Sequence, residues 1–274
     1  MLMPFVADGI ARRIHRERVL LAGWGRAILL QIAHPAVARG VAEHSAFMTE
    51  PGGRLRRLRR TLDAMLTLTF GTDDEALAVA GRINAIHDRV HGTLDAGPDG
   101  APVGPSYSAH DPALLAWVHA TLLDSFLLTY RLFVGPLSGS EADRYCAETS
   151  RIEPRLGIPS GRLPRAEAEL REYVEAMLES GAIEVTETAR SLAREIVARP
   201  APRALAPLVG LAALPSVGLL PAAIREAYRF PWDDRRARAL RVLAATVRGG
   251  LPLVPPRLRY WSVARRAPRR ARPA

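Results

Sequence analysis

The chain has 274 residues, of which 48% are hydrophobic, so it can bury a substantial core and does not have the composition of a disordered protein. Its formal net charge is +10, and all 38 basic residues are arginine, a balance that favours anionic partners. The single cysteine, Cys146, excludes an intramolecular disulfide and fits a reducing compartment.

Helical periodicity runs through most of the chain, and strand alternation is nearly absent. We therefore predict an all-α fold with helices over 18–33, 54–70, 73–91, 113–134, 141–156, 165–180, 186–198 and 233–248. Two start signals support these ranges: Asp111-Pro112 is typical of an N-cap followed by proline, and Ser138 to Glu141 is typical of a capping box.

Glycine and proline mark the breaks between these helices. The longest predicted loop, 92–110, is rich in both and separates two helices with candidate site residues, so it is a candidate lid or substrate-contacting element. Prolines interrupt the apolar run 204–224, which predicts short buried helices rather than a membrane span. We expect one domain over 1–250, including a C-terminal helical portion, and an Arg/Pro-rich tail over 251–274.

His87 and His91 lie four residues apart, which puts them on one face of the predicted helix and suits a pair of metal ligands. His91 falls in the last turn, where the helix dipole favours a protonated ring. His87 lies one turn deeper among apolar neighbours and is the better neutral ligand. The alternative for both is a surface or hydrogen-bonded structural histidine. No Glu follows His87, which excludes a zinc-protease motif.

The apolar segment 117–125 contains His119 and Asp124. Burying such groups without partners costs several kcal/mol, so each needs a ligand, an ion pair or a hydrogen bond. His119 is either a ligand or a structural core histidine. Asp124 requires an arginine, for which Arg57 is a candidate, and the guanidinium of Arg57 also suits a cofactor propionate.

Arg57 belongs to a run of five arginines in residues 54–60, most of which must face solvent. Arg57 is the one expected to share a face with Thr61, one turn further on, where an apolar stretch begins. The sequence contains no GxGxxG, P-loop, GxSxG or CxxC motif, so it lacks the signatures of dinucleotide binding, phosphoryl transfer and serine hydrolysis.

Several motifs then occur in a familiar order: Gln31-Ile-Ala-His-Pro-Ala-Val37, His44-Ser45, Arg57-xxx-Thr61, Phe70-Gly71, His87-xx-Val90-x-Gly92, Tyr107-Ser-Ala-His-Asp-Pro112 and Trp117-Val-His-Ala-Thr-Leu-Leu-Asp-Ser125. This pattern resembles the rubber-oxygenase catalytic-domain family. That family includes the latex-clearing protein and the membrane-bound oxygenase of mycophenolic acid biosynthesis. The resemblance is specific over about 24–164 and weaker towards the C-terminus.

The resemblance implies a globin-like helical core that holds haem b and cleaves carbon–carbon double bonds of isoprenoid chains with dioxygen. By motif position, His87 is the axial iron ligand and His91 the runner-up. Arg57 and Thr61 match an element beside the haem, where we expect a catalytic role and, for Arg57, cofactor contact. His119 and Asp124 match positions that support the cofactor. A distal lysine is excluded, and Arg60 stands where one would occur.

We therefore predict a haem-dependent oxygenase that uses dioxygen on a hydrophobic, isoprenoid or lipid-like alkene. The alternatives are a non-catalytic haem or lipid carrier and a basic protein that binds a membrane or nucleic acid. Nucleic acid is disfavoured because the seven arginines from 257 to 272 have little aromatic interleaving. The N-terminal segment does not match a signal peptide, so we expect a cytoplasmic protein with peripheral membrane contact.

Overall fold

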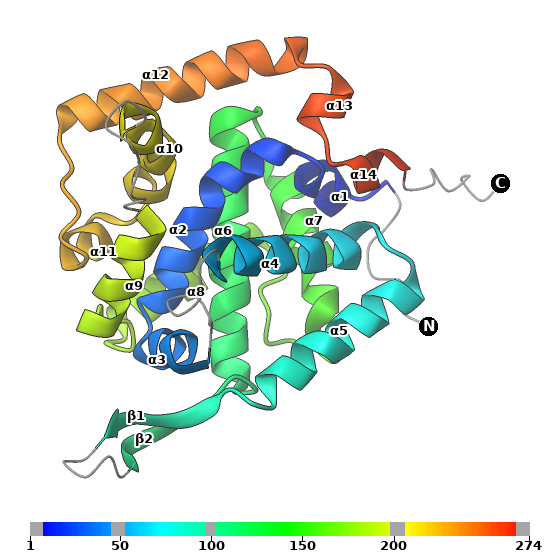
Figure 1. The fold of residues 1–274 in the computed structure, drawn as a ribbon. Helices are drawn as coiled ribbons and strands as arrows, with labels where there is room; N and C mark the ends of the chain where they lie inside the picture. Colours follow the sequence, from blue (N-terminus) through cyan, green and yellow to red (C-terminus); the bar gives the residue numbers. More distant parts are fainter. Residues whose placement is uncertain (1–7, 45–52, 97–101, 198–205, 267–274) are drawn as a thin grey trace.

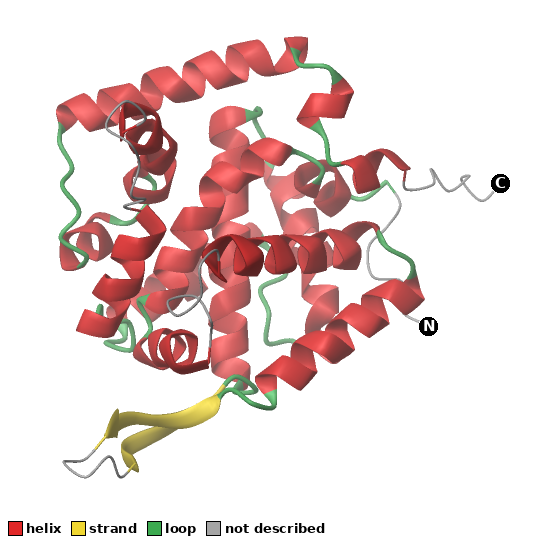
Figure 2. Cartoon of the chain, viewed as in Figure 1, coloured by secondary structure: helices red, strands yellow, loops and turns green. Residues whose placement is uncertain are grey.

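The computed structural model describes residues 8–44, 53–96, 102–197 and 206–266. In these ranges the chain is a bundle of helices with one two-stranded sheet (Figures 1 and 2). The all-α prediction is confirmed. The elements are α1 (Ile10–His15), η1 (Arg18–Leu20), α2 (Leu21–Ile32), α3 (Pro35–His44), α4 (Gly53–Phe70), α5 (Asp73–His87), β1 (His91–Ala96), β2 (Pro102–Ser108), α6 (Pro112–Phe133), α7 (Gly139–Thr149), η2 (Ser150–Arg155), α8 (Glu167–Glu179), α9 (Glu187–Val197), α10 (Ala206–Gly218), α11 (Ala222–Ala227), α12 (Asp234–Gly250), η4 (Leu251–Leu253), α13 (Pro256–Arg259) and α14 (Ser262–Arg266).

Helix α6 is the centre of the bundle, and the other helices surround it (Figure 1). Trp117 and Phe126 on α6 are fully buried. The helix is long and apolar enough to cross a membrane by length and composition alone, yet 61% of its most apolar stretch is buried inside the fold. The core helix of a bundle has the same properties.

Helix α2 crosses α6 at very short range. A Cβ atom at Gly23 would lie 2.0 Å from the Thr129 hydroxyl oxygen, so only glycine allows this approach. One turn further along α2, Arg26 is buried and donates hydrogen bonds to the Ser125 hydroxyl at 2.7 Å and to the Leu219 carbonyl at 2.6 Å. The crossing therefore combines close backbone packing with a buried guanidinium.

Capping groups define where several helices begin. The Asp111 carboxylate caps α6, whose first residue is proline, and Ser138 forms a complete capping box with Glu141 at the start of α7. Both caps confirm the sequence prediction. The buried Glu148 carboxylate serves α1 instead, because it accepts hydrogen bonds from the backbone N–H groups of Ile10 and Ala11. These two hydrogen bonds connect α7 to α1, at the start of the described chain.

The predicted loop 92–110 is wrong, because β1 and β2 form an antiparallel hairpin there (Figure 2). Gly92 pairs with Tyr107, and a Cβ at Gly92 would lie 3.0 Å from the Tyr107 hydroxyl, so glycine makes room for the ring. Tyr107 is buried and donates a 2.6 Å hydrogen bond to Glu43, which fixes the hairpin to α3. Four of the residues that predicted a loop, Gly92, Pro102, Gly104 and Pro105, lie within the strands, whereas 97–101 lie outside the described residues.

The hairpin also changes the predicted helix 73–91. Helix α5 ends at His87, and His91 is the exposed first residue of β1. His87 and His91 therefore do not share a helix face, and His91 does not lie in the last turn of a helix.

The C-terminal part of the chain folds back over the bundle. The apolar run predicted as short helices forms α10 and α11, and α12 packs on α6 and α10 (Figure 1). After α12, residues 251–266 continue as short helices, and Arg259 binds the buried Glu17. The first two thirds of the predicted Arg/Pro-rich tail, 251–266, is therefore docked, whereas 267–274 lie outside the described residues.

Candidate functional site

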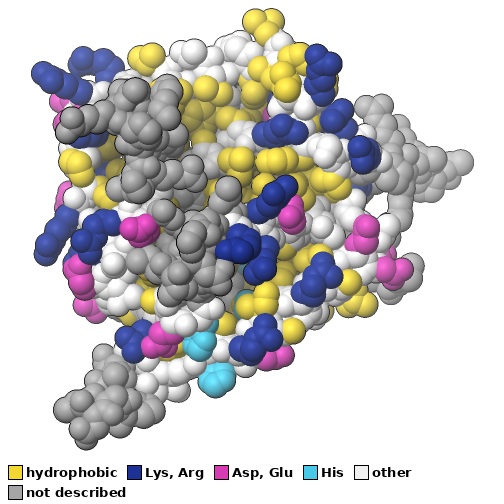
Figure 3. All heavy atoms as spheres, in the orientation of Figure 1, with side chains coloured by type: hydrophobic (Ala, Val, Ile, Leu, Met, Phe, Trp, Pro, Cys, Tyr) yellow, Lys and Arg dark blue, Asp and Glu magenta, His cyan; other side chains and the backbone are white. Residues whose placement is uncertain are grey.

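The seven histidines fall into two groups. His34, His44, His87, His91 and His110 belong to segments around the base of the hairpin, where histidine side chains reach the surface (Figure 3). His15 and His119 lie deeper, in α1 and α6. The surroundings of each side chain determine which of its ring nitrogens are hydrogen-bonded.

His15 is buried between α1, α4 and α7. Its Nδ1 lies 2.9 Å from the Thr69 hydroxyl, and its Nε2 lies 2.8 Å from the Tyr145 hydroxyl. Burial, followed by the nearby His119 ring, lowers the pKa of His15 to about 3. The imidazole is therefore neutral at pH 7 and has both nitrogens occupied, so it is a structural centre rather than an iron ligand.

Sequence reasoning missed His15. Helix α1 has only six residues, which is too short for periodicity to reveal a buried face. The signal that was available is the pair Ile10 and Ile14, which lie on the same face one turn apart and are both buried.

His119 lies on α6 with its Nε2 buried and without a hydrogen-bond partner among the described residues. Burial lowers the pKa of His119 to about 4, although the Glu153 carboxylate acts in the opposite direction. An unsatisfied buried nitrogen costs about 1–3 kcal/mol. The structure therefore holds a neutral imidazole here with one nitrogen open to a ligand or donor.

His87 is the last residue of α5 and is half-buried. Its Nδ1 is buried and has no partner among the described residues. Burial lowers the pKa of His87, with a smaller contribution from His110, whose ring centroid lies 5.7 Å away. His110 itself is 2.7 Å from the Asp88 carboxylate. His87 and His119 are thus the two described histidines with a buried, unpartnered ring nitrogen.

The other predicted site residues are spread over the bundle. The side chain of Arg57 lies outside the described residues, and Thr61, one turn along α4, has an exposed side chain. Asp124 forms an ion pair of 2.6 Å with Arg26 of α2, and not with the predicted Arg57. Asp124 follows His119 by five residues, which places the two side chains about 140° apart around α6. The side chains of Asp124 and His119 therefore face different parts of the fold.

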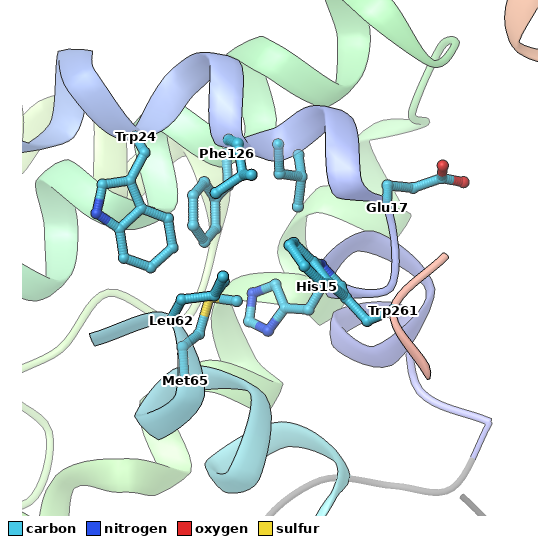
Figure 4. A pocket seen from close by; sticks show the side chains of 9 residues that line it. His15, Glu17, Trp24, Leu62, Met65, Phe126 and Trp261 are labelled. Carbon is cyan, nitrogen blue, oxygen red and sulfur yellow. The ribbon is translucent and has the colours of Figure 1, made fainter. Parts of the chain in front are cut away.

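A small apolar cavity lies beside His15 (Figure 4). Leu62 and Met65 of α4 face Trp24 and Phe126 across it, and Trp261 closes one side. Its volume is about 10 Å³, room for about one water molecule and far below the roughly 300–1,000 Å³ of ordinary cofactor pockets. The cavity at His15 does not accommodate a porphyrin.

Comparison with known proteins identifies the family of the chain and two of its relatives. A family described as the catalytic domain of the ER-bound oxygenase mpaB/B' and rubber oxygenase matches residues 11–249. The chain is 28% identical over 237 residues to the uncharacterised proteins Mb2261 of Mycobacterium bovis and Rv2237 of Mycobacterium tuberculosis, a match that covers 84% of this chain and 88% of each relative. No solved structure matches the chain significantly.

Proposed function

Because the chain belongs to the mpaB/rubber-oxygenase catalytic-domain family, we propose that this oxygenase binds haem b and uses dioxygen on a hydrophobic, isoprenoid or lipid-like alkene. The observation that carries the proposal is the neutral imidazole of His87 with its unpartnered buried nitrogen. Dioxygen and an oxidisable substrate follow from the oxygenase family. The haem and the alkene are our inference.

The donor set fits haem better than an iron ion held by protein side chains alone. The described residues contain no group of three or more His, Cys, Asp or Glu side chains that could hold a metal. A haem iron needs only one or two protein ligands, because the porphyrin supplies four nitrogens. The lowered pKa of His87 keeps its ring unprotonated at pH 7, which metal ligation requires. His119 meets the same two conditions and is the competing ligand.

The other residues of the proposed site would bind the haem and the alkene and hold them in position. When bound, haem supplies a redox-active iron that activates dioxygen. The guanidinium of Arg57 suits a haem propionate, since its fork matches a carboxylate with two parallel hydrogen bonds. Thr61 lies one turn from Arg57 on α4, where its hydroxyl can donate to a polar group beside the ring. An apolar surrounding would hold the alkene and exclude water.

The test is an absorption spectrum of protein purified from haem-supplemented cells. We expect a Soret band in the wild type that is lost in His87→Ala and retained in His91→Ala. His44→Ala is the matched control, because His44 is exposed. Circular dichroism of each variant shows whether the helices are intact. A band lost in His119→Ala but kept in His87→Ala would move the ligand to α6. No band in folded wild-type protein would reject haem binding.

We further propose that the protein works in the cytoplasm against an anionic membrane surface, from which a lipid-like substrate would come. Leu253 is 85% exposed and Leu258 is 59% exposed, in a segment with no acidic residue after Asp234. Hydrophobic side chains gather over the upper part of the face in Figure 3, with arginines at its edge. Exposed aliphatic groups among arginines favour an anionic bilayer.

Co-sedimentation with vesicles tests this contact. We expect the protein to sediment with vesicles that contain phosphatidylglycerol and to stay in the supernatant with pure phosphatidylcholine. Leu253→Ser combined with Leu258→Ser should reduce sedimentation severalfold, whereas Leu77→Ser, at a 64% exposed position on α5, should not. Equal sedimentation of all three proteins would contradict the proposed surface.

A further inference from the structure

The segment Arg259–Trp261 lies across the N-terminal segment Arg16–Arg18. The Arg259 guanidinium donates to both carboxylate oxygens of Glu17, from Nε at 2.8 Å and from a terminal nitrogen at 2.7 Å. The Glu17 side chain is fully buried, and 242 residues of chain separate the two partners. A two-pronged pair of this kind fixes both position and orientation.

Further contacts continue this pairing along the segment. Tyr260 forms an antiparallel β-bridge with Glu17, and the backbone N–H of Trp261 donates to the Arg16 carbonyl at 3.1 Å. The Arg16 guanidinium lies 4.5 Å from the centre of the Tyr260 ring, and Arg18 lies 5.1 Å from that of Trp261. All of these contacts are polar or cation–π, and water can replace each of them when the segment leaves.

Trp261 is also a wall of the apolar cavity beside His15 (Figure 4). The Glu17 carboxylate points away from the cavity, towards Arg259 (Figure 4). The His15 ring is neutral at pH 7 and has both nitrogens occupied. No charged atom therefore faces the interior, so the chemistry of the wall selects a neutral apolar occupant.

We propose that this cavity is a binding site for the end of a neutral apolar chain, and that Arg259–Trp261 is the strap that closes it, with Glu17–Arg259 as the latch. While Trp261 is in place the cavity has a volume of only about 10 Å³, and departure of the indole both enlarges it and opens it to solvent. Opening exposes the two charges of the latch together, so each regains hydration as the pair separates. The inference does not depend on haem.

Fluorescence of the neutral probe N-phenyl-1-naphthylamine measures access to the cavity in the full chain without haem. We expect Trp261→Ala to bind the probe about tenfold or more tightly than the wild type, because the closed state no longer competes. Trp232→Ala is the matched control. Trp232 is likewise half-buried under an arginine, 5.0 Å from the Arg225 guanidinium, and it does not line the cavity. Its probe affinity should remain that of the wild type.

Two further variants make the outcome specific. Leu62→Trp in the Trp261→Ala background refills the cavity and should restore the low wild-type affinity. Equal probe binding in this double variant and in Trp261→Ala would place the probe elsewhere and overturn the inference.

A disulfide between Glu17→Cys and Tyr260→Cys replaces the latch, since these residues are bridge partners and antiparallel partners have Cα atoms about 4.5–5.5 Å apart, within disulfide range. We expect the oxidised protein to exclude the probe and the reduced protein to bind it. The natural Cys146 can stay, because burial raises the pKa of its thiol to about 12 and keeps it unreactive. Equal binding in both redox states would contradict the strap.

Discussion

Arg26→Met will lower the free energy of unfolding by about 3 kcal/mol, near the lower limit expected when one member of a buried ion pair is removed. The Arg26 side chain is 6% exposed and binds three groups from two other parts of the fold: the Asp124 carboxylate, the Ser125 hydroxyl and the Leu219 carbonyl. Methionine retains much of the aliphatic packing but leaves these acceptors unsatisfied. Asp124 is 30% exposed and partly rehydrates, which keeps the loss near the lower limit.

Denaturant unfolding followed by circular dichroism measures this loss. Arg131→Met is the control, because Arg131 pairs with Glu167 at the surface, where both side chains are about one third exposed and such pairs contribute about 0–1 kcal/mol. If Arg26→Met and Arg131→Met unfold at the same denaturant concentration, the buried guanidinium does not hold α2 against α6 as we argue.

Arg26 also shows what sequence reasoning can and cannot find. Asp124 was recognised as a carboxylate in an apolar helix that requires an arginine, and such a pairing follows from the cost of an isolated buried charge. Which arginine fulfils this role depends on how α2 crosses α6, and no local pattern encodes that crossing. The signal for Arg26 is that it is a lone arginine within the apolar segment 21–32, whereas the run of arginines over 54–60 predicts a partner on α4.

The helices could be predicted more fully than the site. Periodicity and caps act over neighbouring residues, so the starts of α6 and α7 were correct. The hairpin depends on Tyr107 packing over Gly92 and binding Glu43 on α3, which are contacts made only after folding. His87 was chosen from its apolar neighbours, and its unpartnered nitrogen is a property that only the structure reveals.

The second large effect is a loss of folding stability at acidic pH. We expect the free energy of unfolding to fall by about 3 kcal/mol between pH 6.5 and pH 5 because of His15 and His119. In the unfolded chain each ring has a pKa of about 6.5, whereas in the folded protein the pKa is about 3 for His15 and about 4 for His119. Between these values the unfolded chain binds more protons than the folded one. Stability is therefore complete above pH 6.5 and is lost as the pH falls towards the folded values.

The size of the loss follows from the same linkage. At pH 6.5 the unfolded ring is half protonated, so each ring contributes about 0.7 kcal/mol per pH unit there and approaches about 1.4 kcal/mol per pH unit near pH 5. Two rings together therefore give about 3 kcal/mol between pH 6.5 and pH 5. His34 and His87 have lowered pKa values as well, and burial is the main cause for both, so they act in the same direction. The carboxyl groups with lowered pKa values, such as that of Glu167, act at more acidic pH, below their ordinary value of 4.5.

Unfolding by urea at a series of pH values from 7.5 to 5 measures the slope. His15→Gln removes one titrating ring while its amide can still bond Thr69 or Tyr145, so the slope should fall by about 1.4 kcal/mol per pH unit, the contribution of one group. His91→Gln, at an exposed position, should leave the slope as it is. An unchanged slope in His15→Gln would mean that His15 takes up its proton without unfolding, and that the interior is open enough to hydrate the charged ring. That outcome would also remove the argument that His119, whose pKa is lowered by the same burial, is held neutral for a ligand.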